Sequence, residues 1–204
     1  MTIRSRAGFG LAMLLVATAC GHAPPTAGFW FEDRAFTLSA DSLRRLGGPL
    51  GPEDIDTIEA VSRADLAQAF SGLPFTITGA HHAHWRVSVV NTVSAPGALA
   101  PAGGSVQLGA LGGGGSVGFV TLATNAIRYA PDAASRKDIL RAIGHGIAGA
   151  AAHEFGHEIL GRAMRDDRSD RDSYEYFSAD RASQYFGTLH WTAAWPLLQQ
   201  QLGG

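Results

Sequence analysis

The amino-acid sequence predicts one domain of the α+β class, in which a small mixed β-sheet packs on a long helix and further helices follow at the C-terminus. The 204 residues are 46% hydrophobic and 17% charged, which suits a single core and leaves too little chain for two ordinary domains. Short segments with β-branched residues occupy the middle of the chain. Longer segments with apolar residues at helical spacing flank them.

Each element of the first half has its own signal. A helix is expected over residues 52–70, because a proline and two acidic residues open a stretch with apolar residues at helical spacing. Strands are expected over residues 75–78, 85–90 and 117–122, where β-branched and aromatic residues gather. Residues 96–118 are mostly glycine, alanine and serine, so a mobile loop is expected there.

The long helix is expected to start at Ser135, because Ser135 and Asp138 have the spacing of a capping box. Its apolar face continues into residues 150–164 through glycines and alanines, whose small side chains predict close packing under the sheet. Two terminal helices are expected over residues 174–186 and 193–202.

The first 19 residues have the pattern of a secretory signal. Arg4 and Arg6 precede an apolar run over residues 7–19, which is shorter than the roughly 20 residues that a membrane-spanning helix needs. The run ends in Ala17-Thr18-Ala19-Cys20, and small residues before the only cysteine resemble a bacterial lipobox. This resemblance implies that Cys20 becomes the acylated first residue of the mature chain.

These features divide the chain into a signal peptide over residues 1–19, a tether over 20–30 and one domain over 31–204. The expected location is the bacterial cell envelope, where a lipid anchor at Cys20 holds the domain on the membrane, facing the periplasm or the exterior. Sixteen basic and 18 acidic residues give a net charge of −2, which argues against a nucleic-acid partner. A single cysteine excludes a disulfide framework and any four-cysteine metal site.

Residues 153–157 read His-Glu-Phe-Gly-His, an HExxH pattern inside the long predicted helix. Residues four apart lie on one face of a helix, so His153 and His157 can hold the same metal ion. Glu154 lies beside that pair and can accept a proton from a water on the metal. Two histidines and a glutamate in an apolar helix are costly unless they are satisfied, so the pattern predicts a zinc site.

Zinc needs a third protein ligand, and the sequence leaves its identity open. A metzincin-like site has a glycine three residues after the second histidine and a histidine three residues later, but Leu160 and Ala163 stand there. A gluzincin-like site takes an acidic ligand from a later helix, for which residues 173–181 are the natural source. The Ala-Asp-Arg at residues 179–181 resembles the Glu-x-x-Ala-Asp-Arg segment of minigluzincin proteases, the group that includes the CAAX prenyl-proteases.

This resemblance implies a zincin-like fold and an acidic third zinc ligand. The family's glutamate falls on Tyr176, so the ligand is either Glu175, one residue earlier, or Asp180 itself. An aspartate of the charged loop, such as Asp166 or Asp170, is the remaining alternative. If Glu175 binds zinc, Asp180 is expected to hold the other nitrogen of a histidine ligand.

The expected function is zinc-dependent hydrolysis of a peptide bond in the cell envelope, with Glu154 activating a zinc-bound water and a peptide or protein as the substrate. The alternative is a non-catalytic zinc-binding envelope lipoprotein that acts as a scaffold or binding partner. The presence of Glu154 favours the enzyme, because a protein that only binds zinc needs no base beside the ligands.

Overall fold

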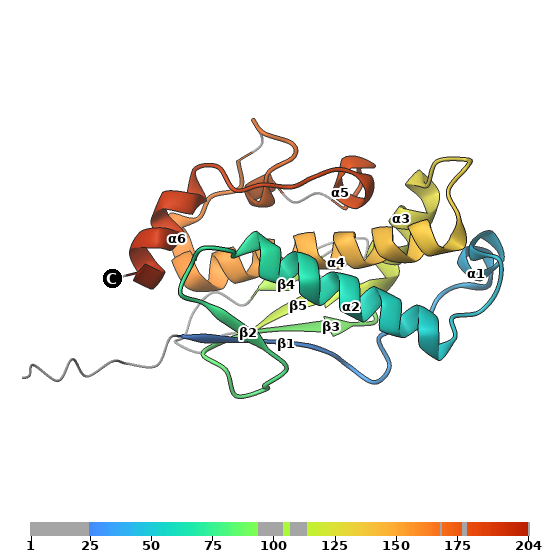
Figure 1. The fold of residues 1–204 in the computed structure, drawn as a ribbon, viewed down its shortest axis with the longest axis horizontal. Helices are drawn as coiled ribbons and strands as arrows, with labels where there is room; N and C mark the ends of the chain where they lie inside the picture. The colour runs from blue at the N-terminus through green and yellow to red at the C-terminus, as the bar shows by residue number, and fades with distance from the viewer. Residues whose placement is uncertain (1–24, 94–103, 107–113, 168, 177–178, 204) are drawn as a thin grey trace, which may run out of the picture.

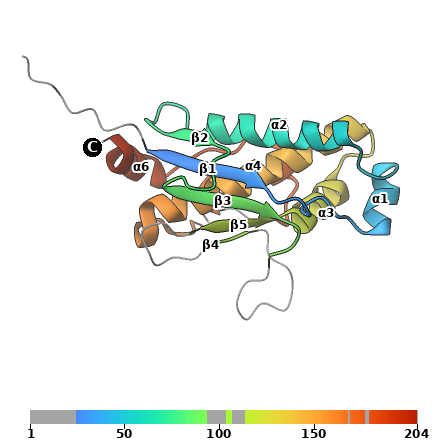
Figure 2. The same cartoon turned by 90° about the horizontal axis from the view of Figure 1, so that it is seen from below.

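The structure, a computed structural model, describes residues 25–93, 104–106, 114–167, 169–176 and 179–203. Its centre is helix α4 (Arg136–Leu160), which runs through the middle of the molecule. A β-sheet lies on one side of α4, and the C-terminal segment lies on the other side (Figure 1). The view from below shows the sheet in front of the helices, so the helices cover only one of its faces (Figure 2).

The sheet is small and mixed, as the sequence predicts. Its strands are β1 (Thr26–Phe31), β2 (Thr76–Thr78), β3 (Trp85–Val90), β4 (Gly104–Val106) and β5 (Gly115–Gly118). Their order is β2-β1-β3-β5-β4, in which only the β4–β5 pair is antiparallel. Val87, Val89 and Val117 face the helices and are fully buried. The sheet therefore turns an apolar face toward α4.

Besides α4, the helical elements are α1 (Ala40–Leu46), α2 (Pro52–Ala69), α3 (Phe119–Tyr129), α5 (Ser183–Phe186), α6 (Ala194–Gly203) and two 3₁₀ turns, η1 (Gly161–Ala163) and η2 (Tyr174–Tyr176). The capping box at Ser135 is confirmed, since its side chain accepts from the Asp138 N–H and the Asp138 carboxylate accepts from the Ser135 N–H. Within the described part of the chain, no helix is long and apolar enough to cross a membrane.

Two of the expected elements are wrong. Residues 119–122 start α3 and do not extend a strand, because Phe119, Leu122 and Ala126 recur at helical spacing and all three are fully buried. The expected helix over 174–186 is broken into η2 and α5. At its start the Tyr174 N–H donates to the carbonyl of His190 at 2.8 Å, so this segment is held by a contact with a distant part of the chain.

The N-terminal region and the glycine-rich region both contribute strands to the sheet. Residues 26–30, which were expected to belong to the tether, lie in β1 and pair with both β2 and β3. Cys20 and the expected signal peptide lie outside the described residues. Most of the expected loop over 96–118 also lies outside them, and its described parts include β4 and β5.

Glycines let the neighbours of α4 approach its backbone closely. A Cβ atom at Gly144 would lie 2.8 Å from Val61 of α2, and one at Gly146 would lie 2.4 Å from the Tyr185 ring of α5. Gly156, inside the HExxH pattern, would place its Cβ 2.4 Å from the sulfur of Met164. The small residues that weaken this helix locally are therefore required by the elements packed around it.

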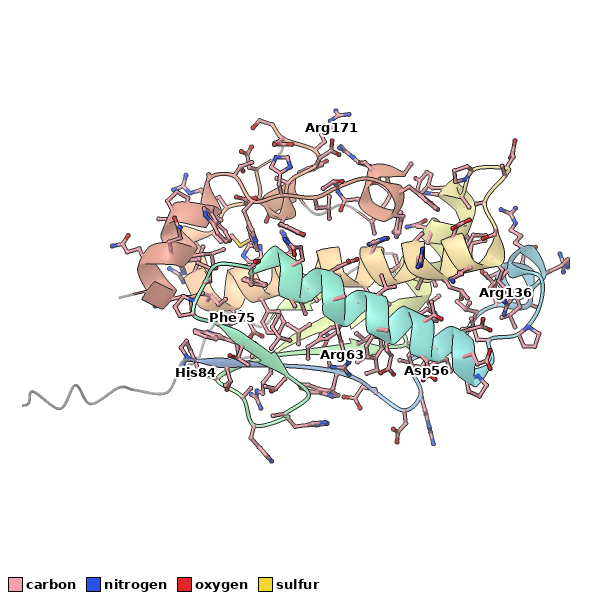
Figure 3. The ribbon with its side chains drawn as sticks, in the orientation of Figure 1. Asp56, Arg63, Phe75, His84, Arg136 and Arg171 are labelled. Carbon is pink, nitrogen blue, oxygen red and sulfur yellow. The ribbon has the colours of Figure 1, made fainter. Side chains whose placement is uncertain are left out.

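Two arginines tie the helical layer to its surroundings, and Figure 3 shows both. Arg63 of α2 reaches the sheet and donates to the carbonyl of Phe29 at 2.9 Å. Arg136, at the start of α4, donates to the carbonyl of Leu46 at 2.6 Å and to the carboxylate of Asp54 at 2.7 Å. The Arg136 hydrogen bond lowers the pKa of Asp54 below its usual value. The start of α4 is thus fixed against the α1–α2 connection.

Replacement of Gly146 by alanine tests the packing around α4. We expect Gly146→Ala to lower the free energy of unfolding by about 1–3 kcal/mol, because the new methyl group overlaps the Tyr185 ring. Without that overlap, alanine would stabilise the helix by about 1 kcal/mol. Urea denaturation measures the change. Gly203→Ala in α6 is the control, since nothing lies within 4 Å of its Cβ position; equal stability of the two variants would contradict the packing argument.

Candidate metal centre

The two histidines of the HExxH pattern converge at the C-terminal end of α4. His153 and His157 lie one turn apart, and their Nε2 atoms are 3.2 Å from each other. The two rings are nearly perpendicular, with an interplanar angle of 81°. Phe155, between them in the sequence, is fully buried and packs edge-on against Phe70 and Phe75 on another face of the helix. This apolar anchor fixes the rotation of the last turns of α4.

The hydrogen bond of its Nδ1 atom determines the tautomer of His153. Its Nδ1 lies 2.7 Å from the carbonyl oxygen of Tyr174, in η2. A carbonyl can only accept, so Nδ1 carries the proton and Nε2 presents a lone pair. Burial lowers the pKa of His153, and the neighbouring His157 lowers it further, against the opposing effect of the Tyr174 bond. His153 is therefore held neutral with Nε2 ready to bind a cation.

A carboxylate completes the cluster. Asp166 follows η1, and its Oδ1 lies 3.1 Å from Nε2 of His157 and 3.7 Å from Nε2 of His153. The ligand atoms of these three residues all lie within 4.8 Å of one another. The Asp166 side chain is 63% exposed, whereas those of His153 and His157 are 13% and 15% exposed. The cluster is thus open on the side of Asp166.

These donors suit zinc. Two imidazole nitrogens and one carboxylate oxygen form a common three-residue set in catalytic zinc sites, which leave a further position for water or substrate. A histidine that binds zinc usually donates its other ring N–H to a carbonyl or carboxylate, which fixes its tautomer and ring orientation. The carbonyl of Tyr174 accepts such a bond from His153. The residues present therefore fit the metal that the HExxH pattern predicts.

Glu154 lies between α4 and the sheet. It is 5% exposed, and a Cβ atom at Gly115 of β5 would lie 3.2 Å from its Cβ, so the strand passes directly against it. Burial raises the pKa of Glu154 to about 8, and the charges of Glu158 and Asp166 add to this rise. A desolvated carboxylate of this kind is a stronger base than an exposed one when it ionises.

Glu158 is a further acidic residue of this region, which lies just outside the HExxH pattern. It follows Glu154 by one helical turn, and its Oε2 accepts the backbone N–H of Arg86 at 2.8 Å. Burial raises the pKa of Glu158 to about 7, although the Arg86 bond opposes the rise. Its carboxylate ties the last turn of α4 to the start of β3. In the sequence, Glu158 could have been identified by its spacing of four residues from Glu154, which places both side chains on one face of the helix.

The other candidate ligands lie in different settings. Asp170 pairs with His190, with 2.8 Å between its Oδ2 and the His190 Nε2. Glu175 is 1% exposed, and its Oε1 accepts from the backbone N–H groups of Thr192 and Ala194 at 2.8 and 2.7 Å and from the Thr192 hydroxyl at 3.1 Å. It therefore caps the start of α6. The Tyr129 hydroxyl donates to the backbone carbonyl of Asp180. Among the described residues, none of these candidates joins the three-residue cluster, and Tyr174 takes the place beside His153 that was expected for Asp180.

Comparison with known proteins supports the fold. No protein-family model matches the sequence, and no curated protein matches it. A structural match is the crystal structure of archaemetzincin from Methanopyrus kandleri, with a TM-score of 0.50 and 12% sequence identity. The match covers 93% of this chain and all of that one. The chain thus has a zincin-like α+β fold over nearly its whole length, and at this identity the likeness concerns the fold alone.

The third ligand can be tested by metal binding. We expect Asp166→Ala to weaken zinc affinity by more than about 100-fold, because the ion is left with two imidazoles, whereas the loss of an outer partner costs about 10–100-fold. Asp167→Ala removes the same charge one residue later, outside the cluster, and is expected to bind zinc like the wild type. Competition titration against a chelator measures both. Wild-type affinity in Asp166→Ala would exclude Asp166 and return the search to Glu175, Asp180 and Asp170.

Proposed function

We propose that this protein is a zinc-dependent metallopeptidase of the bacterial cell envelope. The observation that carries the proposal is the convergence of His153, His157 and Asp166 beside the buried base Glu154. Its setting, at the end of the central helix of a zincin-like fold, supports the same conclusion. We propose Asp166 as the third ligand, since its carboxylate approaches both imidazoles and completes the cluster found among the described residues.

The chain's own groups supply the remaining chemistry. Zinc, when bound by His153, His157 and Asp166, supplies Lewis-acid polarisation of the attacking water and of the scissile carbonyl. Glu154 accepts the proton that the water loses as its oxygen attacks the carbonyl carbon. Glu154 then passes this proton to the amide nitrogen as the carbon–nitrogen bond breaks, which releases an acid and an amine. The burial of Glu154 limits exchange of that proton with solvent.

An extended peptide is the substrate form that the sheet can accept. Strand β4 lies at the end of the described sheet order and pairs with β5 on one side. It also contacts α4, the helix that carries His153 and His157. A strand in this position can bind an extended chain by backbone hydrogen bonds, which supply affinity while pockets for side chains supply specificity.

The envelope location rests on the sequence of the N-terminus. The basic head, the short apolar run and the small residues before Cys20 favour export followed by acylation of that cysteine. The lipid would hold the domain at a membrane surface through the few residues that separate Cys20 from Thr26, the first residue of β1. A substrate in the same envelope layer follows from this placement.

Replacement of the base separates catalysis from metal binding. We expect Glu154→Gln to retain zinc, because the three ligands remain, and to cleave peptides at least about 100-fold more slowly. The measurements are metal content and cleavage of a mixed peptide library by zinc-loaded protein. Equal rates in wild type and Glu154→Gln would remove Glu154 from the mechanism. A wild-type protein that holds zinc and cleaves nothing would favour the alternative function, a zinc-binding scaffold.

The anchor is tested by a single substitution. Cys20→Ser is expected to abolish lipid attachment and to release the protein from membranes, since serine lacks the thiol that is acylated. Partitioning between detergent and aqueous phases reports the change in cells that export the full chain. If the variant stays in the detergent phase as the wild type does, the lipoprotein assignment is incorrect.

A further inference from the structure

A pocket of about 340 Å³ adjoins the candidate metal centre. Its lining includes Asp166, Glu175, Met164, Ala163, Ala194 and Leu197. Asp166 belongs to both the metal cluster and the pocket. A peptide whose scissile bond lies at the metal can therefore place a neighbouring side chain in this pocket.

The walls of the pocket are largely apolar, and its most buried lining residue is a carboxylate. Glu175 is 1% exposed, compared with 4% for Met164 and 3% for Ala194. Its Oε1 already accepts three hydrogen bonds from Thr192 and Ala194. Its Oε2 is buried and has no hydrogen-bond partner among the described residues.

The Oε2 atom of Glu175 is therefore free to accept a hydrogen bond from a ligand. A buried carboxylate is stable when each oxygen is satisfied, and an unmet oxygen costs free energy that a bound donor can recover. The three donors to Oε1 hold the carboxylate in place, so Oε2 has a fixed position before any ligand arrives. A positively charged donor gains most from such a site, because a charge-assisted hydrogen bond is stronger than a neutral one.

The other charges of the pocket agree with a cationic occupant. Asp167 also lines it, as does Asp166, whose charge is taken up by the proposed zinc ion, while its basic lining residue, Arg165, is an exposed residue of the loop. Lysine and arginine side chains combine an apolar stem with a charged end. The stem matches the alanine, methionine and leucine walls, and the charged end matches Oε2.

We propose that the pocket of Glu175 selects substrates with a lysine or arginine next to the scissile bond. This inference rests on the proposed peptidase function and adds a substrate class to it. Glu175 then has two roles. One oxygen fixes the start of α6, and the other binds the cationic side chain of the substrate.

The first test needs no variant. Zinc-loaded wild-type protein is incubated with a peptide library in which one position is lysine, arginine, norleucine, glutamine or glutamate on a constant scaffold. We expect cleavage next to lysine and arginine with kcat/KM at least about 10-fold above that for norleucine, because only the cation can use the charge of Glu175. Cleavage that is equal for lysine and norleucine overturns the inference and leaves the proposed function standing. An absence of any cleavage overturns the proposed function itself.

The second test uses Glu175→Gln, which keeps an acceptor oxygen for Thr192 and Ala194 and removes the charge. We expect kcat/KM for the lysine and arginine peptides to fall roughly 10- to 100-fold, while the norleucine peptide is cleaved as before. Glu53→Gln, which makes the same substitution at an exposed position of α2 outside the pocket, is the matched control and is expected to leave these ratios unchanged. Zinc content is measured in every variant. Loss of zinc from Glu175→Gln would mean that Glu175 serves the metal and would overturn the inference.

A third readout does not depend on turnover. The zinc-loaded Glu154→Gln protein is titrated with arginine amide and with norleucine amide in a calorimeter. We expect arginine amide to bind more tightly, and this difference to disappear in Glu154→Gln/Glu175→Gln. Equal affinity of the two amides for Glu154→Gln would contradict recognition of the cation by Glu175.

Discussion

The packing of neighbours around α4 is the constraint on which the rest of the structure depends. The sheet lies on one side of this helix, α2 packs along it, and the C-terminal segment covers the remaining side. Gly144, Gly146 and Gly156 leave room for these neighbours at distances that a methyl group would not allow. Because the helix is held on several sides, its last two turns can present His153 and His157 in one fixed direction.

The C-terminal segment provides the hydrogen bonds that orient His153 and fix the last helix. The carbonyl of Tyr174 sets the tautomer of His153, and the next residue, Glu175, fixes the start of α6 with one carboxylate oxygen. These adjacent residues couple the orientation of His153, a candidate metal ligand, to the docking of the last helix. The same segment forms one wall of the pocket beside Asp166. A single short stretch therefore connects metal binding, packing and the proposed recognition of substrate.

The electrostatics of the site point toward a cation. Glu154 and Glu158 lie in the last turns of α4, where burial raises the pKa of each. The negative charge of Asp166 raises the pKa of Glu154 further. The C-terminal end of a helix also carries a partial negative charge. A bound dication would offset these charges, and His153 is held in the neutral form that can bind it. The arrangement is costly for an empty protein and favourable for a zinc-binding one.

Local patterns in the sequence determined the fold class, the strand over 85–90, the capped start of α4 and the HExxH pair, because spacing along one element places residues on a face. The region after α4 was decided only by the tertiary structure. Asp166 approaches the histidines because η1 and its loop turn back over α4, and Glu175 instead caps α6, a helix that follows it in the chain. The sequence holds several acidic residues at plausible spacings there. Only long-range contacts, such as the pairing of Ser173 with His190, decide which carboxylate faces the cluster.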